Sequence, residues 1–412
     1  MNLLNKVRPF CAPDRLAFWT LLASGTYVVL LSSAVFMIRR LSFWVEILLY
    51  ALPWLLLWPA YRWRVITDPA RRREIVLMLI ILILGTVNVI AGDHPYNSYK
   101  TMRYFLSAGI LSLWASMFLL ADPGRREVFD WFCCICLAIF APLAIITYLP
   151  SRQELFWLRN VFNLHSIPVG TMVILLAAGP LSLLVSESSK QKIAAWLLIS
   201  VGLILILLTH KRGTFLAVAA MILVWLTYRL PKLGYLVAAA CLAVLLLFTY
   251  QGLNASRSLA PDHPSRVSKL HRLELYPFAL HVYKKHPWMG IGLRPQTHEK
   301  YLGDYQQQHP EVTKFAAEVK SLQTFDNMLV TAFVELGTLM TLTYLGLIIF
   351  IIINYCRQVR PFADSQGRDF FRLLPLVGLA VHSLTYDSLL VHPVNWLFHV
   401  QLGILAGFWA SD

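Results

Sequence analysis

The stretch MLVTAFVELGTLMTLTYLGLIIFIIINY, from Met328 to Tyr355, decides the fold class. Glu335 is its single charged residue, and the stretch is longer than the roughly 20 apolar residues that cross a bilayer as a helix. The whole chain of 412 residues is similar in character, with 58% hydrophobic residues and a mean hydropathy of +0.60. Only 14% of the residues are charged, against about 25% in soluble domains. These values exclude a soluble globular protein.

Apolar stretches of this kind recur along almost the whole chain, and we predict an all-α polytopic membrane protein with about twelve transmembrane helices. The predicted spans are Leu16–Ile38, Phe43–Ala60, Ile75–Ala91, Tyr104–Leu120, Phe129–Tyr148, Ile167–Val185, Ile193–Leu208, Thr214–Tyr228, Leu233–Tyr250, Met328–Tyr355, Phe371–Leu390 and Val394–Ala410.

The distribution of basic residues predicts the orientation, because short loops rich in Lys and Arg remain in the cytoplasm. With the N-terminus inside, the inner segments carry 18 Lys and Arg residues and the short outer loops carry 8. Both termini are therefore predicted to be cytoplasmic. The formal net charge of +14 is spread over many membrane-flanking loops, which argues against nucleic acid as a partner and for contact with membrane lipids.

The spans divide the chain into three parts of one integral membrane domain. Residues 1–250 hold the first nine spans, residues 251–326 form one large outer loop, and residues 327–412 hold the last three spans. Within the loop we predict a helix from Ser265 to His286 that is interrupted near Pro277, and a second helix around Pro310–Leu322.

Several kinds of chemistry lack the residues that they need. Gly290-Ile291-Gly292 has no strand before it, so a dinucleotide fold is not supported. Cys133, Cys134 and Cys136 lie in an apolar stretch, which favours buried small side chains over a metal site. We predict no metal and no cofactor.

The first candidate site is the short outer connection Thr209–Thr214, in which Lys211 and Arg212 follow His210. Two adjacent cations on the outer side oppose the bias that keeps Lys and Arg in inner loops. A helix is predicted to begin at once after Arg212, so its free N–H groups and positive dipole end point to the same surface as the two cations. This arrangement suits a phosphate or diphosphate. A solvated turn in contact with lipid headgroups explains the residues equally well.

Two further candidates lie in and after the outer loop. Arg272 and Tyr276 are one helical turn apart and share a face, although an ordinary surface helix would show the same spacing. Asp326 and Asn327 come directly before the tenth span, where Asp326 is either the N-cap of the helix or a general base at the membrane surface.

Deeper in the predicted spans lie Glu335 and Asp387, and ionisable groups at such depth are functional suspects. Glu335 could instead belong to an internal hydrogen-bonded pair. His382 and Asp387, five residues apart on one predicted helix, are offset by more than a turn, so we do not predict a dyad.

Three of these features, in this order and on one side of the membrane, resemble the O-antigen ligase/polymerase superfamily. They are the Lys-Arg-Gly turn, the Arg-containing outer helix that leads into His286-Pro-Trp-Met-Gly-Ile-Gly, and the Asp-Asn entry to the helix that contains Glu335-Leu-Gly. Twelve helices with a large loop between the ninth and tenth are most similar to the O-antigen ligase branch. The resemblance implies a glycosyltransferase of the C type in the bacterial inner membrane, with its active site in the periplasm.

The resemblance also implies roles for individual residues. The donor would be a glycan on undecaprenyl diphosphate and the acceptor a lipid A-core oligosaccharide, with inversion and without a metal. Arg212 and Arg272 would hold the diphosphate with the help of Lys211. Asp326 stands where the family commonly has His, and His271, His286 and His298 are alternative bases. We predict further substrate contacts from His210, Arg266, Tyr276, Arg294 and Asn327.

Two other functions remain open on the sequence. A polysaccharide polymerase would use the same donor with a second carrier-linked repeat as the acceptor. A transporter or flippase also suits twelve helices, but such folds tend to show two similar halves, whereas the polar signals here lie in the last half and on one face.

Overall fold

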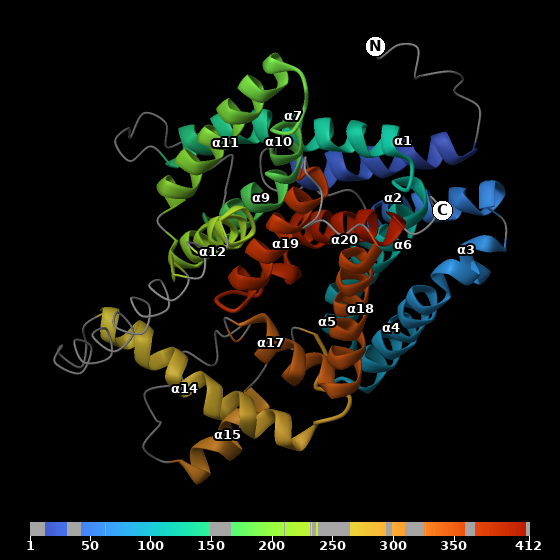
Figure 1. Ribbon diagram of the computed structural model, residues 1–412. Coiled ribbons are helices and arrows are strands. Elements are labelled where there is room, and N and C mark those ends of the chain that lie inside the picture. Colours follow the sequence, from blue (N-terminus) through green and yellow to red (C-terminus); the bar gives the residue numbers. More distant parts are fainter. Residues whose placement is uncertain are drawn as a thin grey trace.

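The computed structural model describes residues 13–30, 43–61, 63–148, 166–209, 211–230, 264–293, 299–309, 327–358 and 367–408, together with residues 232, 236, 237 and 325. Within these ranges every regular element is a helix and no strand occurs (Figure 1). The prediction of an all-α chain is confirmed there.

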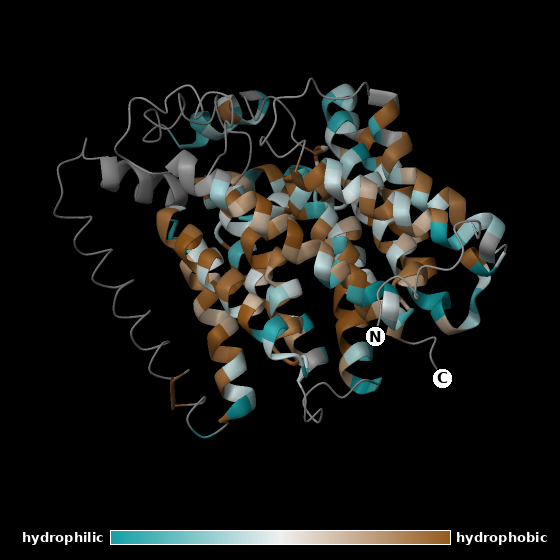
Figure 2. Cartoon of the chain, turned by 90° about the horizontal axis from the view of Figure 1, so that it is seen from above, coloured by the Kyte–Doolittle hydropathy of each residue, from teal (hydrophilic) through white to brown (hydrophobic). Residues whose placement is uncertain are grey.

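Four described helical segments are long and apolar enough to cross a membrane: Pro69–Ala91, Pro95–Leu119, Ser189–Thr209 and Met328–Gln358. Two shorter apolar helices span Leu48–Pro59 and Pro168–Leu183. Apolar residues predominate along the helices, as the hydropathy colouring in Figure 2 shows. These findings agree with a membrane protein, while the number of about twelve spans stays a prediction. Most of the predicted ninth span, Leu233–Tyr250, lies outside the described residues.

The helices follow one another in this order. The first part of the chain holds α1 (Pro13–Thr26), α2 (Phe43–Tyr61), α3 (Arg64–Thr67), α4 (Arg72–Ala91), α5 (Pro95–Tyr104), α6 (Ser112–Leu119) and α7 (Pro123–Tyr148). Then come α9 (Ser166–Leu176), α10 (Ala178–Leu183), α11 (Ser189–Thr209) and α12 (Arg212–Arg229). The last part holds α14 (Pro264–Lys285), α15 (Glu299–Gln308), α17 (Met328–Thr331), α18 (Gly337–Gln358), α19 (Arg368–Ser383) and α20 (His392–Gly407).

The helix α20 forms the centre of the helical body. Its residues are buried from Pro393 to Gly407, and it packs against α6, α9 and α18. Glycine makes these close contacts possible: a Cβ atom added at Gly403 would lie 1.8 Å from the Ser116 hydroxyl. Small residues allow such approach between helices in a membrane, where apolar burial alone does not drive association.

The helices α14 and α15 pack together at one end of the molecule, at the bottom of Figure 1. Their shared apolar core contains Leu275, Phe278 and Tyr305, and Phe325 and Val334 from the following segment join it. The helix α14 also packs against α17 and the π-helical turn Ala332–Leu336. The outer segment is thereby attached to the entry of the tenth predicted span.

Two details of the predicted outer loop need correction. The helix α14 is not interrupted near Pro277 but continues through it, and the proline is exposed. The helix α15 was not predicted, although Tyr301, Leu302 and Tyr305 give it a buried face. The predicted helix Pro310–Leu322 lies outside the described residues.

Two of the predicted spans that bear on the candidate site are not regular helices throughout. The tenth is broken between α17 and α18 by the π-helical turn Ala332–Leu336 and by Gly337, whose φ is +76°. In the eleventh, α19 ends at Ser383, and a short 3-10 turn, Ser388–Leu390, follows. His382 and Asp387 therefore do not share a helix, and our treatment of them as an offset helical pair was wrong.

Candidate functional site

The first part of the candidate site is the start of α12. Lys211 is the N-cap residue, with extended backbone, and its carbonyl accepts hydrogen bonds from the Thr214 N–H (3.1 Å) and the Phe215 N–H (3.3 Å). Arg212 is the first helical residue and its side chain is exposed. The remaining N–H groups of a first helical turn have no partner within the helix and carry partial positive charge. The turn therefore presents two cations and a helix N-terminus together, as predicted.

The next residue, Gly213, lies against the connection between α19 and α20. A Cβ atom at Gly213 would lie 2.2 Å from the Thr385 hydroxyl oxygen, so only glycine fits while Thr385 keeps its position. Thr385 is itself held, because its N–H and its hydroxyl both donate to the His382 carbonyl, at 2.9 and 2.8 Å. The cationic turn is thus in contact with a fixed loop.

The entry to the tenth predicted span reaches the same loop. Asn327 is the N-cap of α17: its Oδ1 accepts from the Leu329 N–H (3.0 Å) and the Val330 N–H (3.3 Å). Its Nδ2 donates to the Leu384 carbonyl at 3.1 Å. Leu384 and Thr385 are consecutive, so one connection contacts both Asn327 and Gly213. Two motifs far apart in sequence are brought together in this way.

Buried polar groups contact this connection from inside the protein. The Nδ1 atom of His382 lies 2.7 Å from the Ser388 hydroxyl, and the Thr171 hydroxyl lies 3.3 Å from the same nitrogen. Asp387, between them in sequence, is only 1% exposed. His382 and Asp387 stood out in the sequence, but their position at the connection that joins the two motifs was not predicted.

A second structural unit, which we call the clasp, joins residues 287–292 to residues 334–339. The Ile291 and Gly292 N–H groups donate to the Val334 and Glu335 carbonyls at 3.1 and 3.0 Å. In return, the Thr338 N–H donates to the Pro287 carbonyl at 2.9 Å. The motif Gly290-Ile291-Gly292 is therefore a structural contact between the outer segment and the broken helix.

Three glycines and one asparagine make the clasp possible. Gly290, Gly292 and Gly337 have φ values of +68°, +96° and +76°, a region that favours glycine. Asn88 of α4 is buried, and its Nδ2 donates to the Met289 carbonyl (2.6 Å) and the Glu335 carbonyl (2.9 Å). The Glu335 side chain is fully buried in the π-helical turn.

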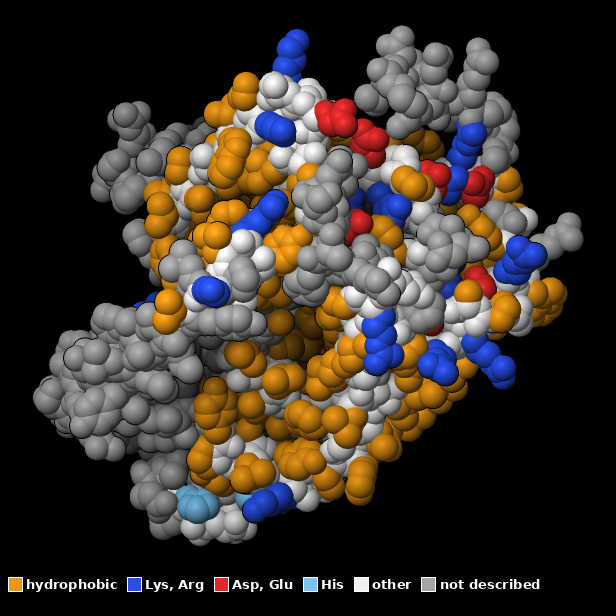
Figure 3. Space-filling view, in the orientation of Figure 1, with side chains coloured by type: hydrophobic (Ala, Val, Ile, Leu, Met, Phe, Trp, Pro, Cys, Tyr) orange, Lys and Arg blue, Asp and Glu red, His pale blue; other side chains and the backbone are white. Residues whose placement is uncertain are grey.

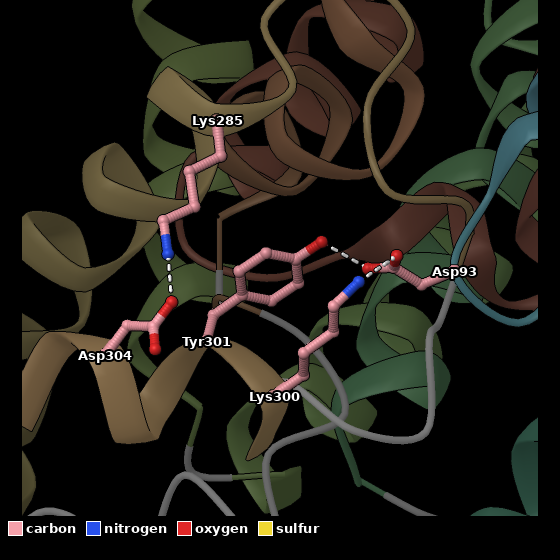
Figure 4. Close-up of polar contacts among 5 residues, drawn as sticks. All are labelled: Asp93, Lys285, Lys300, Tyr301 and Asp304. Carbon is pink, nitrogen blue, oxygen red and sulfur yellow. Dashed lines mark hydrogen bonds and ion pairs between the residues drawn. The ribbon is translucent and has the colours of Figure 1, made fainter.

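A polar contact ties α15 to the segment between α4 and α5 (Figure 4). Asp93 accepts hydrogen bonds from the Lys300 ammonium, at 2.8 Å, and from the Tyr301 hydroxyl. Burial alone raises the pKa of Asp93, but these two hydrogen bonds and the Lys300 charge outweigh it and hold the pKa below its usual value. Lys285 of α14 pairs with Asp304 of α15 beside this contact. These contacts join α14 to α15, and α15 to the segment between α4 and α5.

The predicted site residues fall into three groups. Lys211, Arg212 and Asn327 are described, and the Leu384–Thr385 connection brings their segments together. Tyr276 is 39% exposed on α14. Arg266 and Arg272 are placed on the same helix by its backbone, but their side chains are outside the described part. His210, Arg294 and Asp326 lie outside the described residues altogether.

No group of three or more His, Cys, Asp or Glu residues that could hold a metal ion occurs among the residues that the structure describes.

The described part of the chain is all-helical with apolar helices long enough to cross a membrane, and the start of α12 presents two cations next to the connection that Asn327 also contacts. Residues 193–345 match the family model described as O-antigen ligase, and this match supports assigning the chain to the O-antigen ligase family. The matched segment contains the Lys211–Gly213 turn, α14, the clasp and the Asn327 cap, so it agrees with the resemblance seen in the motifs. A search of curated proteins found no match.

Proposed function

We propose that this chain is an O-antigen ligase that transfers a glycan from undecaprenyl diphosphate to a lipid A-core oligosaccharide at the periplasmic face of the inner membrane. The observation that carries the proposal is the contact of the Leu384–Thr385 connection with both Gly213 and Asn327. Through this contact the Lys211–Arg212 turn, which we propose binds the diphosphate, and the segment in which the family has its base share one neighbouring connection. The family match over residues 193–345 supports glycosyl transfer as the class of reaction.

In the proposed reaction, the acceptor hydroxyl oxygen attacks the anomeric carbon of the donor glycan, and the bond from that carbon to the diphosphate oxygen breaks. The diphosphate leaves with the electron pair. Arg212 and Arg272, with Lys211, stabilise its charge, because prearranged cations act most strongly where charge develops in the transition state. Asp326 accepts the proton of the acceptor hydroxyl. Attack from the face opposite the leaving group inverts the anomeric configuration.

The described contacts support this arrangement from two directions. The side chain of Arg212 is exposed at a helix N-terminus, where it can meet a diphosphate at the membrane surface. The helix that carries Arg272 packs against α17, which Asn327 caps. Asp326 directly precedes this cap, so the proposed base and both proposed clamps belong to elements that contact one another or the same loop.

The test is an in vitro transfer assay with undecaprenyl-diphosphate glycan, lipid A core as the acceptor, a chelator present and no nucleotide added. We expect Arg212→Ala and Arg272→Ala each to lower the rate by about 10²–10³-fold, and Asp326→Ala to lower it by about 10²–10⁴-fold. Arg357→Ala is the matched control, because Arg357 is an exposed cation at the other end of α18. An equal loss in Arg357→Ala, or full activity of all three site variants, would contradict the proposed site.

The same assay separates the alternative functions. Growth of the glycan only on a second carrier-linked repeat would identify a polymerase. If neither product forms, while liposomes that contain the protein move the lipid-linked glycan across the bilayer, the protein is a transporter.

A further inference from the structure

An apolar groove runs along the hairpin of α11 and α12, where residues of α9, α10 and α19 complete its wall. Its volume is about 620 Å³. Among its described lining residues, Lys192 and Arg229 are the only charged ones, and the rest are almost all apolar. Trp196 and Trp225 also line it, and both have exposed surface. Figure 3 shows that apolar side chains cover much of the described surface on one face of the molecule.

The two cations lie at one end of the groove. Lys192 is near the start of α11 and Arg229 is the last residue of α12, so the hairpin places both at the end opposite Lys211 and Arg212. From Arg212 to Arg229 the helix rises by about 25 Å, at 1.5 Å per residue. No single diphosphate reaches both ends. The cationic end of the groove is therefore separate from the site proposed above, and the inference below does not rest on it.

We propose that this groove binds one anionic glycerophospholipid from the leaflet at the Lys192–Arg229 end. The headgroup phosphate pairs with Lys192 and Arg229, and an acyl chain lies along the apolar wall. The wall extends from Lys192 to Ile206, about 21 Å along α11, which exceeds the roughly 15 Å half-thickness of a bilayer core. The two tryptophans suit the interface, where indole rings are enriched.

The charge pattern favours this occupant over the other lipid that could enter, the polyprenyl chain of the donor. A polyprenyl chain attached to a diphosphate at Lys211 and Arg212 would reach the groove from the opposite end and would leave the two cations without an anion. The basic residues at the Lys192–Arg229 end are among those that predict a cytoplasmic location. The cytoplasmic leaflet is rich in anionic lipid, which attracts Lys and Arg near its surface.

The test measures lipid binding by native mass spectrometry. Full-length protein, delipidated in detergent, is titrated with phosphatidylglycerol or with phosphatidylcholine of the same acyl chains. We expect one phosphatidylglycerol to bind more tightly than phosphatidylcholine. The double variant Lys192→Gln/Arg229→Gln should weaken the binding of phosphatidylglycerol by about 30-fold, because each cation contributes roughly a factor of five near an anionic headgroup.

Two matched controls accompany these variants. Lys190→Gln/Lys232→Gln removes the same charge from exposed positions outside the lining and should leave binding unchanged. Leu203→Trp fills the groove and should weaken the binding of both lipids, whereas Leu197→Trp, on the same helix but outside the lining, should not. A thermal unfolding curve for each variant separates lost binding from lost folding.

Three results would overturn the proposal. The first is equal affinity for the two phospholipids, and the second is an equal loss of binding in Lys190→Gln/Lys232→Gln. The third is displacement of the bound lipid by undecaprenyl diphosphate, with loss of that displacement in Arg212→Ala, which would assign the groove to the donor chain. Failure of the transfer assay would not affect any of these measurements.

Discussion

The substitution Gly290→Ala tests whether the clasp between residues 287–292 and 334–339 fixes the outer segment to the broken helix. At a φ of +68° an alanine costs about 1–2 kcal/mol. Its Cβ atom would also lie 2.3 Å from the Glu335 carbonyl oxygen and 2.5 Å from the Gly337 nitrogen. Both atoms are backbone, so the segments must separate, and overpacking of this kind adds about 1–3 kcal/mol. We therefore expect Gly290→Ala to lower the free energy that stabilises the clasp by about 2–5 kcal/mol.

The expected effect can be measured by hydrogen exchange with mass spectrometry. The Ile291 and Gly292 N–H groups donate across the clasp, so a peptide that covers residues 287–293 reports its opening. If the clasp opens locally, a loss of about 3 kcal/mol in its stability lowers the protection of these amides against exchange by about 100-fold. The apparent midpoint of thermal unfolding in detergent should also fall, and transfer activity should fall with it.

The matched control is Gly303→Ala. Gly303 lies on the exposed side of α15, and no atom lies within 4 Å of an added Cβ. Alanine in a helix interior is preferred over glycine by about 0.5–1 kcal/mol, so this variant should be neutral or slightly more stable. Unchanged exchange of residues 287–293 in Gly290→Ala, or an equal loss of protection in Gly303→Ala, would refute the reasoning.

Three further predictions concern the contacts around the site. Gly213→Ala should lower transfer activity about tenfold because the added Cβ collides with the Thr385 hydroxyl. Adding Thr385→Ala removes this collision and should restore the activity. A double variant that is no more active than Gly213→Ala would contradict the prediction. Asn327→Asp should keep the helix cap but lose the hydrogen-bond donor to the Leu384 carbonyl, so transfer activity should fall more than thermal stability. Asn327→Ala should lower both activity and thermal stability. Equal effects of the two variants on both measurements would contradict this prediction. The pKa of Asp93 is lowered in the folded protein, so its contribution to stability is present above about pH 4 and is lost as the pH falls through the folded pKa. Asp93→Asn should therefore lower the midpoint of thermal unfolding at pH 7 and reduce the fall of that midpoint toward acid pH. A curve of midpoint against pH that runs parallel to wild type would exclude this role.

The sequence predicted the parts of this fold that depend on local pattern. Apolar stretches indicated helices, and α12 begins at the Lys211–Arg212 turn as expected. The interpretation of Asp326 as the N-cap of the tenth span was wrong by one residue, because the Asn327 side chain accepts the hydrogen bonds from the first helical turn of α17. These features need only neighbouring residues to be recognised. The family match over residues 193–345 confirms the resemblance that the order of the motifs suggested.

The sequence could not predict where apolar segments break inside the protein. The helix α19 ends at Ser383 although Leu384, Leu389 and Leu390 keep the following segment apolar, and across this end the His382 Nδ1 lies 2.7 Å from the Ser388 hydroxyl. Hydropathy reports burial, and a buried loop is as apolar as a buried helix. The role of Gly290-Ile291-Gly292 was hidden for a related reason, since its partners lie more than forty residues later in the chain.

These breaks are where the candidate site forms, and there is a physical reason for it. A regular helix satisfies its own backbone groups and offers only side chains to a neighbour, whereas a broken helix frees carbonyl and N–H groups for contacts with other segments. The Leu384 carbonyl accepts a hydrogen bond from the Asn327 side chain, and the Glu335 carbonyl accepts one from the Gly292 N–H and one from the Asn88 side chain. The backbone groups released by the two broken helices thus fix the outer segment and the Asn327 cap in place. We infer that precise placement of the proposed clamps depends on these two breaks, so substitutions that restore a regular helix there should harm transfer more than they harm folding.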